Sequence, residues 1–200
     1  MFNLKLKIPR EVTVAVSGGI DSMVALHFLQ RNHKVTVAHY VHNSEFAKKE
    51  LEFVTDYCQK QNIPIIIKHQ KEVRGSNQSR EEYWRSGRYE FLQSIRQQVV
   101  VATTLDDAVE WYVFSAAHGL GKYIKPTNAN IIRPFIITTK KAITAYATKH
   151  SVVWLEDESN QDITFAARNR VRHLILPELL KVNPGLYKTV KKRIEDSSIG

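Results

Sequence analysis

Residues 12–26 read Val-Thr-Val-Ala-Val-Ser-Gly-Gly-Ile-Asp-Ser-Met-Val-Ala-Leu, and this stretch decides which fold the chain can adopt. The β-branched run at 12–16 is typical of a buried strand. Apolar residues from Met23 onward recur at helical spacing, so a helix is predicted to follow, with Asp21 or Ser22 as its N-cap. A strand, a tight turn and a helix in immediate succession indicate the first unit of an α/β protein.

The turn between that strand and that helix carries two consecutive glycines, Gly18 and Gly19. Because they have no side chains, the backbone can approach a ligand closely. The N–H groups at the helix start and the positive end of the helix dipole then favour an anion such as phosphate. An ordinary turn is the simpler alternative. The turn is not a Walker loop, since no lysine follows Gly19 in the required spacing, and it lacks the third glycine of a dinucleotide fingerprint.

The composition fits one globular domain, or one domain with a small appendage, and a basic surface. The chain has 200 residues, 29 basic and 20 acidic, for a net charge of +9 and a pI near 9.6. This charge indicates a polyanionic partner, although a generic basic protein would carry it too. The single cysteine, Cys58, excludes an intrachain disulfide or a CxxC redox site. With no signal-peptide pattern and no apolar stretch of membrane-spanning length, we expect a cytoplasmic protein with no membrane partner.

Strands and helices alternate along most of the chain. Strands are expected at 34–40, 65–67 and 98–102, an extended piece at 131–135, and helices at 44–61, 80–96, 105–118 and 139–150. Residues 119–130, rich in Gly, Pro and Asn, are expected to form a loop. The alternation predicts an α/β fold with a doubly wound, mostly parallel sheet. We place the main domain at 1–165 and a short, basic helical tail that completes it at 166–200.

Carboxylates gather where the predicted sheet would bind a ligand, beyond the carboxyl ends of its strands. Asp107 and Glu110 are three residues apart at the start of a predicted helix, so both can point toward the turn that holds Asp21. Two or three carboxylates beside a phosphate site are a typical magnesium arrangement. Asp106 and Asp107 could instead merely cap the helix, with Glu110 in solvent. His39 and His42 are interpreted as strand-end residues that touch substrate or solvent, because their spacing makes no metal site.

A basic cluster stands in the tail. Residues 168–173 read Arg-Asn-Arg-Val-Arg-His, with Arg168 and Arg172 four residues apart. Three guanidinium groups so close together suit the phosphates of a nucleic acid, which they bind bidentately while counterions are released. A solvated basic helix is the alternative.

One rival motif overlaps the glycine turn. Residues 15–19 nearly match the GxSxG nucleophile elbow of α/β-hydrolases, with Ala15 in place of the first glycine. A hydrolase also needs a late acid and then a histidine, and Asp157 and His173 stand in that order. Phosphate binding is nonetheless favoured, because Asp21 would oppose an oxyanion and a basic tail would have no task in a hydrolase.

The glycine turn and several later segments together resemble one enzyme family. Residues 17–22, SGGIDS, resemble the SGGxDS PP-loop of the N-type ATP pyrophosphatases. Five further segments resemble elements of tRNA(Ile)-lysidine synthetases: 102–110 (AHHLDDxxE), 132–135 (RPL), 156–160 (EDxSN), 168–172 (RNxIR) and 177–179, the close of the catalytic domain. The PP-loop alone is specific to the superfamily, whereas the ordered set, over about residues 11–186, is specific to the family. The resemblance implies a PP-loop ATPase fold of the Rossmann-like HUP type.

This resemblance also implies a function. A lysidine synthetase is an ATP-dependent ligase that acts on the wobble cytidine of a CAU-anticodon tRNA(Ile). ATP adenylates the C2 oxygen and pyrophosphate leaves, and the ε-amine of free lysine then displaces AMP. The implied cofactors are ATP and Mg²⁺, and the implied partners are tRNA and free lysine. The oligomeric state stays open, with a homodimer as one option.

The resemblance assigns roles residue by residue. The implied ATP-binding residues are those of the PP-loop: Ser17, Gly18, Gly19, Ile20, Asp21 and Ser22. Asp21 and Asp107 would hold magnesium, and together with Glu110 they form the implied catalytic set. The residues that would hold tRNA or the adenylated intermediate are Arg168, Asn169, Arg170 and Arg172.

The chain departs from the family pattern at two places. Thr103 and Thr104 stand where the family has paired histidines, and the element after the second strand is reduced to residues 41–44. Two other functions therefore stay open. One is a different PP-loop enzyme that thiolates tRNA or amidates a small molecule, although tRNA thiolases of this superfamily often need paired cysteines. The other is a weakly catalytic RNA-binding relative.

Overall fold

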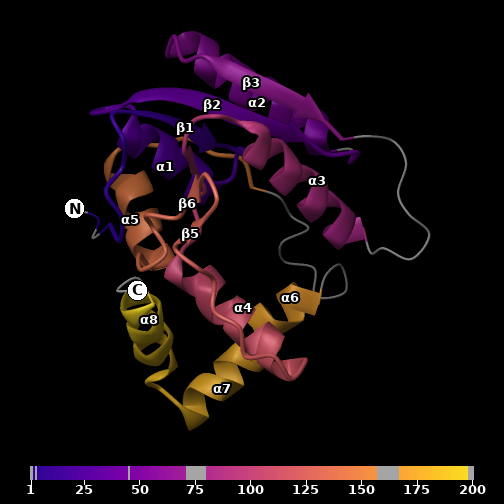
Figure 1. Ribbon diagram of the computed structural model, residues 1–200, viewed down its shortest axis with the longest axis vertical. Coiled ribbons are helices and arrows are strands. Elements are labelled where there is room, and N and C mark those ends of the chain that lie inside the picture. Colours follow the sequence, from indigo (N-terminus) through magenta and orange to yellow (C-terminus); the bar gives the residue numbers. More distant parts are fainter. Residues whose placement is uncertain (1, 3, 45, 71–79, 157–166, 198–200) are drawn as a thin grey trace.

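The computed structural model describes residues 2, 4–44, 46–70, 80–156 and 167–197. A six-stranded sheet has the order β3-β2-β1-β4-β6-β5. In Figure 1 the sheet and the helices that cover it form the upper part of the molecule, and α4, α6, α7 and α8 form the lower part. The predicted α/β class with a doubly wound, mostly parallel sheet is confirmed.

The central strands of the sheet are parallel. β1 (Glu11–Ala15) pairs with β2 (Lys34–Val41) on one side and with β4 (Val99–Val100) on the other. β3 (Ile65–His69) extends the sheet beyond β2, and β6 (Ile131–Ile132) pairs with β4. The edge strand β5 (Thr127–Asn128) is antiparallel to β6. The prediction of a loop over 119–130 is wrong at this strand, because a strand of two residues is too short to show an alternating pattern.

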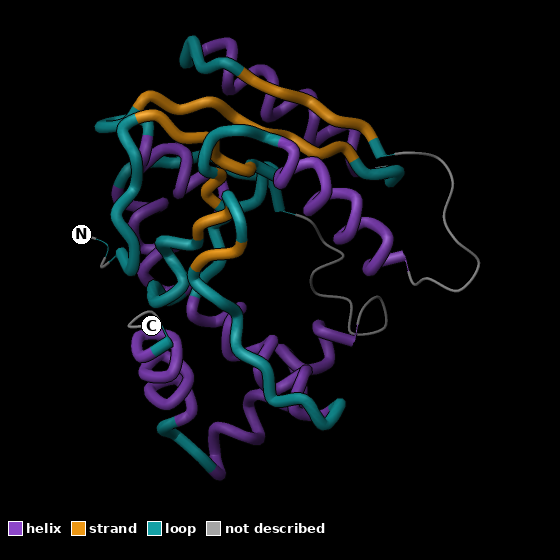
Figure 2. Tube along the Cα trace, viewed as in Figure 1, coloured by secondary structure: helices purple, strands orange, loops and turns teal. Residues whose placement is uncertain are grey.

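Helices cover both faces of the sheet (Figure 2). One core, between the sheet and α1 (Ile20–Leu29), α2 (Phe46–Lys60) and α5 (Lys140–Lys149), contains the alternate β1 residues Val12 and Val14. A smaller core on the other face lies against α3 (Arg80–Ser94), through Phe91 and Leu92. Successive residues of a strand point to opposite faces, so the buried run at 12–16 serves both cores.

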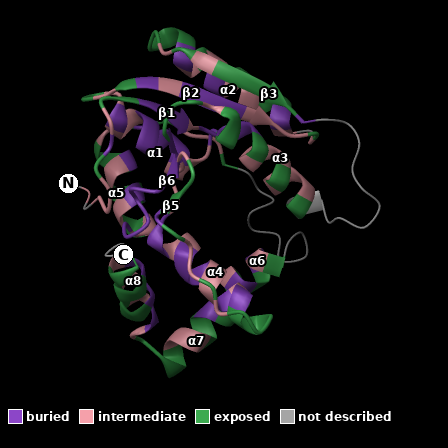
Figure 3. Cartoon of the chain, in the orientation of Figure 1, coloured by how far each residue is buried: buried purple, intermediate pink, exposed green. Residues whose placement is uncertain are grey.

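The C-terminal helices complete the fold around α4 (Leu105–Ala117). Residues 167–182 form α6 (Ala167–Arg170), a π-helical segment (Val171–Ile175) and α7 (Leu176–Val182), and α8 (Leu186–Asp196) follows. A third core lies between them and contains Leu105, Ala108, Val109, Val113, Val171, Leu176, Leu186, Val190 and Ile194. Figure 3 shows buried residues along α4 and the exposed outer side of α8. The described helices of the tail therefore share a core with α4.

Two local expectations are corrected by the structure. Asp21 and Ser22 lie inside the first turn of α1, whose N-cap is Gly19. His39 is not a strand-end residue: β2 continues to Val41, and the His39 side chain is buried with its Nδ1 atom 2.8 Å from the carbonyl oxygen of Val16. Burial lowers the pKa of His39, so this histidine stays neutral.

No helix within the described residues combines the length and apolar character that a membrane crossing requires. Cys58 is buried as a free thiol, and burial raises its pKa to about 11.

Candidate active site

The candidate site lies where the direction of the sheet's winding changes. β1 and β4 are neighbours in the sheet but are separated in the chain by two other strands. In such a sheet the loops after the two central strands diverge and leave a crevice at their carboxyl ends. The glycine turn follows β1 and the N-terminus of α4 follows β4, so both predicted groups meet at this edge.

The glycine turn is held in an open conformation by its own serines. Gly18 has φ +98°, a left-handed conformation that favours glycine. The Ser17 amide donates to the Ser22 hydroxyl at 3.2 Å, and that hydroxyl donates to the Gly19 carbonyl at 2.8 Å. Gly19 has no side chain to cap α1, so among the described residues no side-chain cap occupies the first-turn N–H groups of this helix. This geometry suits a phosphate.

The N-terminus of α4 is closed by its own side chains. The Thr104 backbone N–H and hydroxyl both donate to Asp107 Oδ2 at 2.8 Å, and the Asp107 N–H donates to Thr104 Oγ1 at 3.3 Å. This capping box fixes the Asp107 carboxylate and leaves its Oδ1 atom pointing to the site. Thr104, which stands where the resembled family has a histidine, is therefore the residue that orients Asp107.

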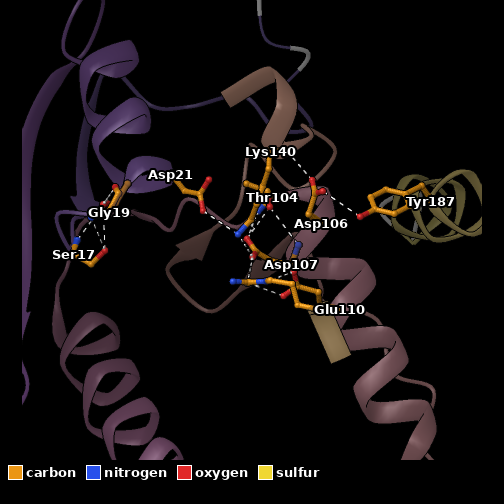
Figure 4. Close-up of polar contacts among 11 residues, drawn as sticks. Ser17, Gly19, Asp21, Thr104, Asp106, Asp107, Glu110, Lys140 and Tyr187 are labelled. Carbon is orange, nitrogen blue, oxygen red and sulfur yellow. Dashed lines mark hydrogen bonds and ion pairs between the residues drawn. The ribbon is translucent and has the colours of Figure 1, made fainter. Parts of the chain in front are cut away.

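Lys140, which was not among the predicted site residues, joins the two carboxylates. Lys140 Nζ lies 3.4 Å from Asp107 Oδ1 and 3.6 Å from Asp21 Oδ2 (Figure 4). Burial would lower the pKa of Lys140, but Asp107 and Asp21 outweigh it and raise the pKa. Lys140 is the first residue of α5, after the Thr139 cap. Ligand-binding residues of such a sheet follow the carboxyl ends of its strands, and Lys140 follows β6, so the same rule predicts Lys140 at the site.

Glu110 and Arg172 form a bidentate ion pair beside Asp107. Arg172 Nε and Nη2 donate to the two oxygens of Glu110 at 2.7 and 2.9 Å, and Nη2 lies 3.9 Å from Asp107 Oδ1. The Glu110 side chain is only 7% exposed, so it is not the solvated residue of the capping-only interpretation. Arg172 enters from the π-helical segment, a geometry that often occurs at functional sites. Arg172 thus points into the site.

Asp106 makes structural contacts, unlike Asp107, which points into the site. Its Oδ2 atom accepts the Lys140 backbone N–H at 2.7 Å, and its Oδ1 atom accepts the Tyr187 hydroxyl at 3.1 Å. Burial and the Asp106 charge raise the pKa of Tyr187, so this phenol stays a donor. Asp106 therefore ties the start of α5 and the helix α8 to α4. No sequence signal pointed to Tyr187, which lies 81 residues from Asp106.

The charges of the cluster suit a divalent cation. Four carboxylates (Asp21, Asp106, Asp107 and Glu110) face two cationic side chains, for a formal charge of −2. Burial raises the pKa of Asp21 to about 6 against the lowering effect of Lys140. Asp21 Oδ1 is buried without a hydrogen-bond partner among the described residues. The described residues hold no group of three or more potential metal ligands, but the Asp21 and Asp107 oxygens suit Mg²⁺ if phosphate oxygens or water complete its coordination.

A cavity of about 340 Å³ adjoins the carboxylates. Its polar lining is Asp106, Glu110, Lys140 and Arg172, and its other lining residues are Leu176, Pro177, Leu180 and Tyr187. A lining that combines acidic, basic and apolar groups suits a small zwitterion with an alkyl chain.

The other two arginines of the basic cluster, Arg168 and Arg170, lie on α6. Arg170 is exposed, Arg168 is half-buried and Asn169 is 7% exposed. Of the predicted RNA-binding set, the structure therefore places Arg170 at the surface and brings only Arg172 to the carboxylates. Asp157, the acid of the hydrolase alternative, lies outside the described residues.

The chain matches known proteins over most of its length. A family model described as a PP-loop domain matches residues 2–179. The tRNA(Ile)-lysidine synthase of Lactiplantibacillus plantarum is 34% identical over 93% of this chain and 46% of its own length, and that of Thermotoga maritima is 32% identical over 92% and 48%. The bifunctional protein TilS/HprT of Listeria innocua is 33% identical over 94% of this chain and 32% of its own. The chain spans about half the length of the lysidine synthases that it matches.

Solved structures share the fold. The U34-tRNA thiolase NcsA from Methanococcus maripaludis superposes with a TM-score of 0.73 at 18% identity, covering 96% of this chain and 72% of its own. The NH3-dependent NAD synthetase from Campylobacter jejuni superposes with a TM-score of 0.52 at 17% identity, covering 96% and 86%. At such identities the likeness concerns the fold alone.

Proposed function

The chain belongs to the PP-loop family, and we propose that it is an ATP-dependent ligase that joins lysine to the wobble cytidine of a CAU-anticodon tRNA(Ile). The observation that carries this proposal is that Lys140 joins Asp21, in the first turn of the open, glycine-lined helix α1, to Asp107 at the start of α4. The similarity to named tRNA(Ile)-lysidine synthases supports the choice of substrates.

In this proposal the PP-loop holds the phosphates. The backbone of Ser17, Gly18, Gly19 and Ile20 and the hydroxyls of Ser17 and Ser22 surround the start of α1, where an anion is stabilised by N–H groups and the helix dipole. The cytidine C2 oxygen bonds to the α-phosphorus of ATP while the bond to pyrophosphate breaks. Donors placed around the leaving pyrophosphate lower the barrier by stabilising its developing charge.

Asp21 and Asp107 would hold Mg²⁺, which when bound neutralises charge on the ATP phosphates. Lys140, whose ammonium lies between these two carboxylates, would donate to a phosphate oxygen of bound ATP. Arg172, held by Glu110, is aimed at the same space and suits the phosphate of the adenylated intermediate.

The cavity beside Glu110 is the proposed lysine site. Leu176, Pro177 and Leu180 can cover the alkyl chain of lysine, and Glu110 and Asp106 lie close enough to attract its ammonium. In the second step the neutral ε-amine bonds to cytidine C2 while the bond from C2 to the adenylated oxygen breaks, so AMP leaves with that oxygen. The amine must first give up a proton, which a neighbouring carboxylate or phosphate can accept.

The proposal is tested by product analysis. Incubating the protein with ATP, Mg²⁺, lysine and the CAU-anticodon tRNA is expected to yield AMP, pyrophosphate and a lysidine nucleoside, measured by mass spectrometry of digested tRNA. The same tRNA with a different wobble base is the control. Pyrophosphate without lysine in the RNA would show that the amine is misassigned; no nucleotide turnover at all would favour the weakly catalytic relative.

Replacing Lys140 with alanine is expected to slow pyrophosphate release about 100-fold, the typical cost of removing one donor to a developing charge. Lys140→Arg should retain part of the rate, because it keeps a cation at the same position. Lys141→Ala is the matched control, since Lys141 is exposed on the next position of α5. Rates of pyrophosphate release by all three variants provide the measurement, and a Lys140→Ala rate equal to the control would remove Lys140 from the reaction.

A further inference from the structure

The chain that follows α5 contacts the glycine turn directly. The Leu155 N–H donates to the Gly18 carbonyl at 2.9 Å, and the two residues lie far apart in the sequence. The Leu155 side chain reaches the same glycine, because a methyl group on the Gly18 α-carbon would lie 3.7 Å from Leu155 Cδ1. Phe53 and Val54 of α2 approach that position as closely, at 3.6 and 3.7 Å. Gly18 is therefore held by one hydrogen bond and surrounded by three apolar side chains.

The end of α5 fixes the start of the segment that carries Leu155. Ser151 has φ +49°, a left-handed conformation, and its N–H donates to the Thr148 carbonyl at 3.3 Å. The Val152 N–H donates to the Ala147 carbonyl at 3.0 Å. These two bonds form the Schellman motif that commonly ends a helix. The motif therefore sets the direction in which the chain leaves α5.

Residues 152–155, which we call the brace, are anchored in the core beside the sheet. Val152 is buried, and Trp154 packs against the core that contains the β1 residues. Val153 between them is 56% exposed, as expected of an extended segment whose side chains alternate in direction. The two anchored side chains hold the brace in place, so that Leu155 is a fixed donor beside Gly18.

The bond to the Gly18 carbonyl determines the direction of the next N–H group. The carbonyl and the N–H of one trans peptide unit point in opposite directions, because the unit is planar. The Gly18 carbonyl points to Leu155, so the Gly19 N–H points away from the brace. The Gly19 nitrogen lies 3.4 Å from the Ser17 hydroxyl oxygen, a long contact that a phosphate oxygen can replace (Figure 4). Leu155 thus orients a donor of the glycine turn through Gly18.

A peptide unit between two glycines has little preference of its own for this direction. Because Gly18 and Gly19 have no side chains, the unit between them can rotate through half a turn at little steric cost. The rotated unit would present the Gly18 carbonyl oxygen to the anion site, where it would repel phosphate. The bond from Leu155 favours the orientation that offers the N–H group instead.

We propose that Leu155 is a positioning residue for phosphate binding, and that the brace selects the orientation of the Gly18–Gly19 peptide unit in which the Gly19 N–H faces the phosphate. The inference rests on the proposed function in treating the glycine turn as the phosphate site; control of the turn from the end of α5 is an addition to it. A turn that spends part of its time in the rotated orientation binds more weakly, in proportion to the fraction that stays competent.

Replacing the Leu155 N–H with an ester oxygen tests the bond and keeps the side chain. The α-hydroxy acid analogue of leucine is placed at position 155, and the affinity for inorganic pyrophosphate with Mg²⁺ is measured by calorimetry. The affinity should fall about 10-fold, a factor within the range for one hydrogen bond. Leu155→Ala should weaken binding less, by about 3-fold, because the bond to Gly18 stays. Val153→Ala, at the exposed position of the brace, should bind as wild type.

A matched ester at Ile63 separates the orientation of the turn from the stability of the fold. The Ile63 N–H donates to the Cys58 carbonyl at 2.9 Å at the end of α2, and Ile63 and Leu155 are both half-buried aliphatic residues. Each ester removes one backbone hydrogen bond, so both should lower the melting temperature by about 2–4 °C. Only the Leu155 ester should weaken the binding of pyrophosphate.

The outcomes separate this inference from the proposed function. Equal pyrophosphate affinities of the Leu155 and Ile63 esters would show that the bond to Gly18 only stabilises the fold, and would overturn the inference. If the Leu155 ester does not fold, equal affinities of Leu155→Ala and Val153→Ala would overturn it. If lysidine forms but the two esters bind pyrophosphate alike, the proposed function survives and the inference fails. If only the Leu155 ester loses affinity and no lysidine forms, the inference survives and the proposed function fails.

Discussion

Asp21→Asn and Asp107→Asn are each expected to abolish pyrophosphate release, with a loss of about 1,000-fold or more. Each variant removes one of the two carboxylates that meet at Lys140, so the site loses a ligand for Mg²⁺ and the charge that attracts a cation. A loss of several kcal/mol of charge stabilisation in the transition state corresponds to this factor.

Pyrophosphate release at saturating ATP and Mg²⁺ is the measurement. Asp56→Asn is the matched control, because Asp56 is exposed on α2, and it should behave as wild type. Asp107→Asn also weakens the capping box of α4, by about 1 kcal/mol, whereas Asp21 caps nothing. Two folded variants that turn over normally would refute the assignment of the metal site to these carboxylates.

Glu110→Ala is expected to lower the free energy of unfolding by about 3 kcal/mol. The Glu110 side chain is 7% exposed and both of its oxygens bind Arg172, so the substitution leaves a largely buried guanidinium without its partner. Removing one member of a buried pair costs about 3–5 kcal/mol. We expect the lower value of this range, because the Arg172 side chain is 30% exposed and can recover some hydration. The melting temperature should fall by about 6–12 °C, since 1 kcal/mol shifts a protein of this size by about 2–4 °C.

Urea unfolding gives the free energies, and a surface ion pair provides the control. Glu178 Oε1 lies 2.8 Å from Lys181 Nζ, but both side chains are about 70% exposed. Glu178→Ala should therefore change the free energy of unfolding by less than about 0.5 kcal/mol. A double variant, Glu110→Leu with Arg172→Met, should regain much of the stability and still lack activity. If Glu110→Ala were as stable as Glu178→Ala, the pair would carry no structural role.

The strands and the glycine turn could be predicted because their signals are local. The β-branched run at 12–16 and the glycines after it determine their own conformation, and the carboxyl-end rule then brought Asp21 and Asp107 to one edge. Asp107 also proved to be a capping residue, so its capping and the predicted site geometry are compatible rather than alternatives.

The residues that were missed depend on contacts across the chain. Lys140 contacts Asp21 across 119 positions of sequence, and Tyr187 reaches Asp106 only because α8 packs on α4. The sequence alone does not distinguish Arg172 from the other two arginines of its cluster. The π-helical segment gives it a different environment from Arg170, which no helical periodicity of 3.6 would show.

The two helix starts at the crevice differ in a way that gives the site a polarity. α1 begins at Gly19 with no side-chain cap, whereas α4 begins with its N–H groups engaged by Thr104 and Asp107. The carboxylate at the start of α4 is thus bound to that helix's own backbone, whereas the Asp21 carboxylate in the first turn of α1 contacts Lys140 and leaves the N–H groups of α1 available to an anion. A nucleotide that enters the crevice meets attraction for phosphate on one wall and for cations on the other. We therefore expect the nucleotide to place its phosphates at the start of α1, before any contact to its base forms.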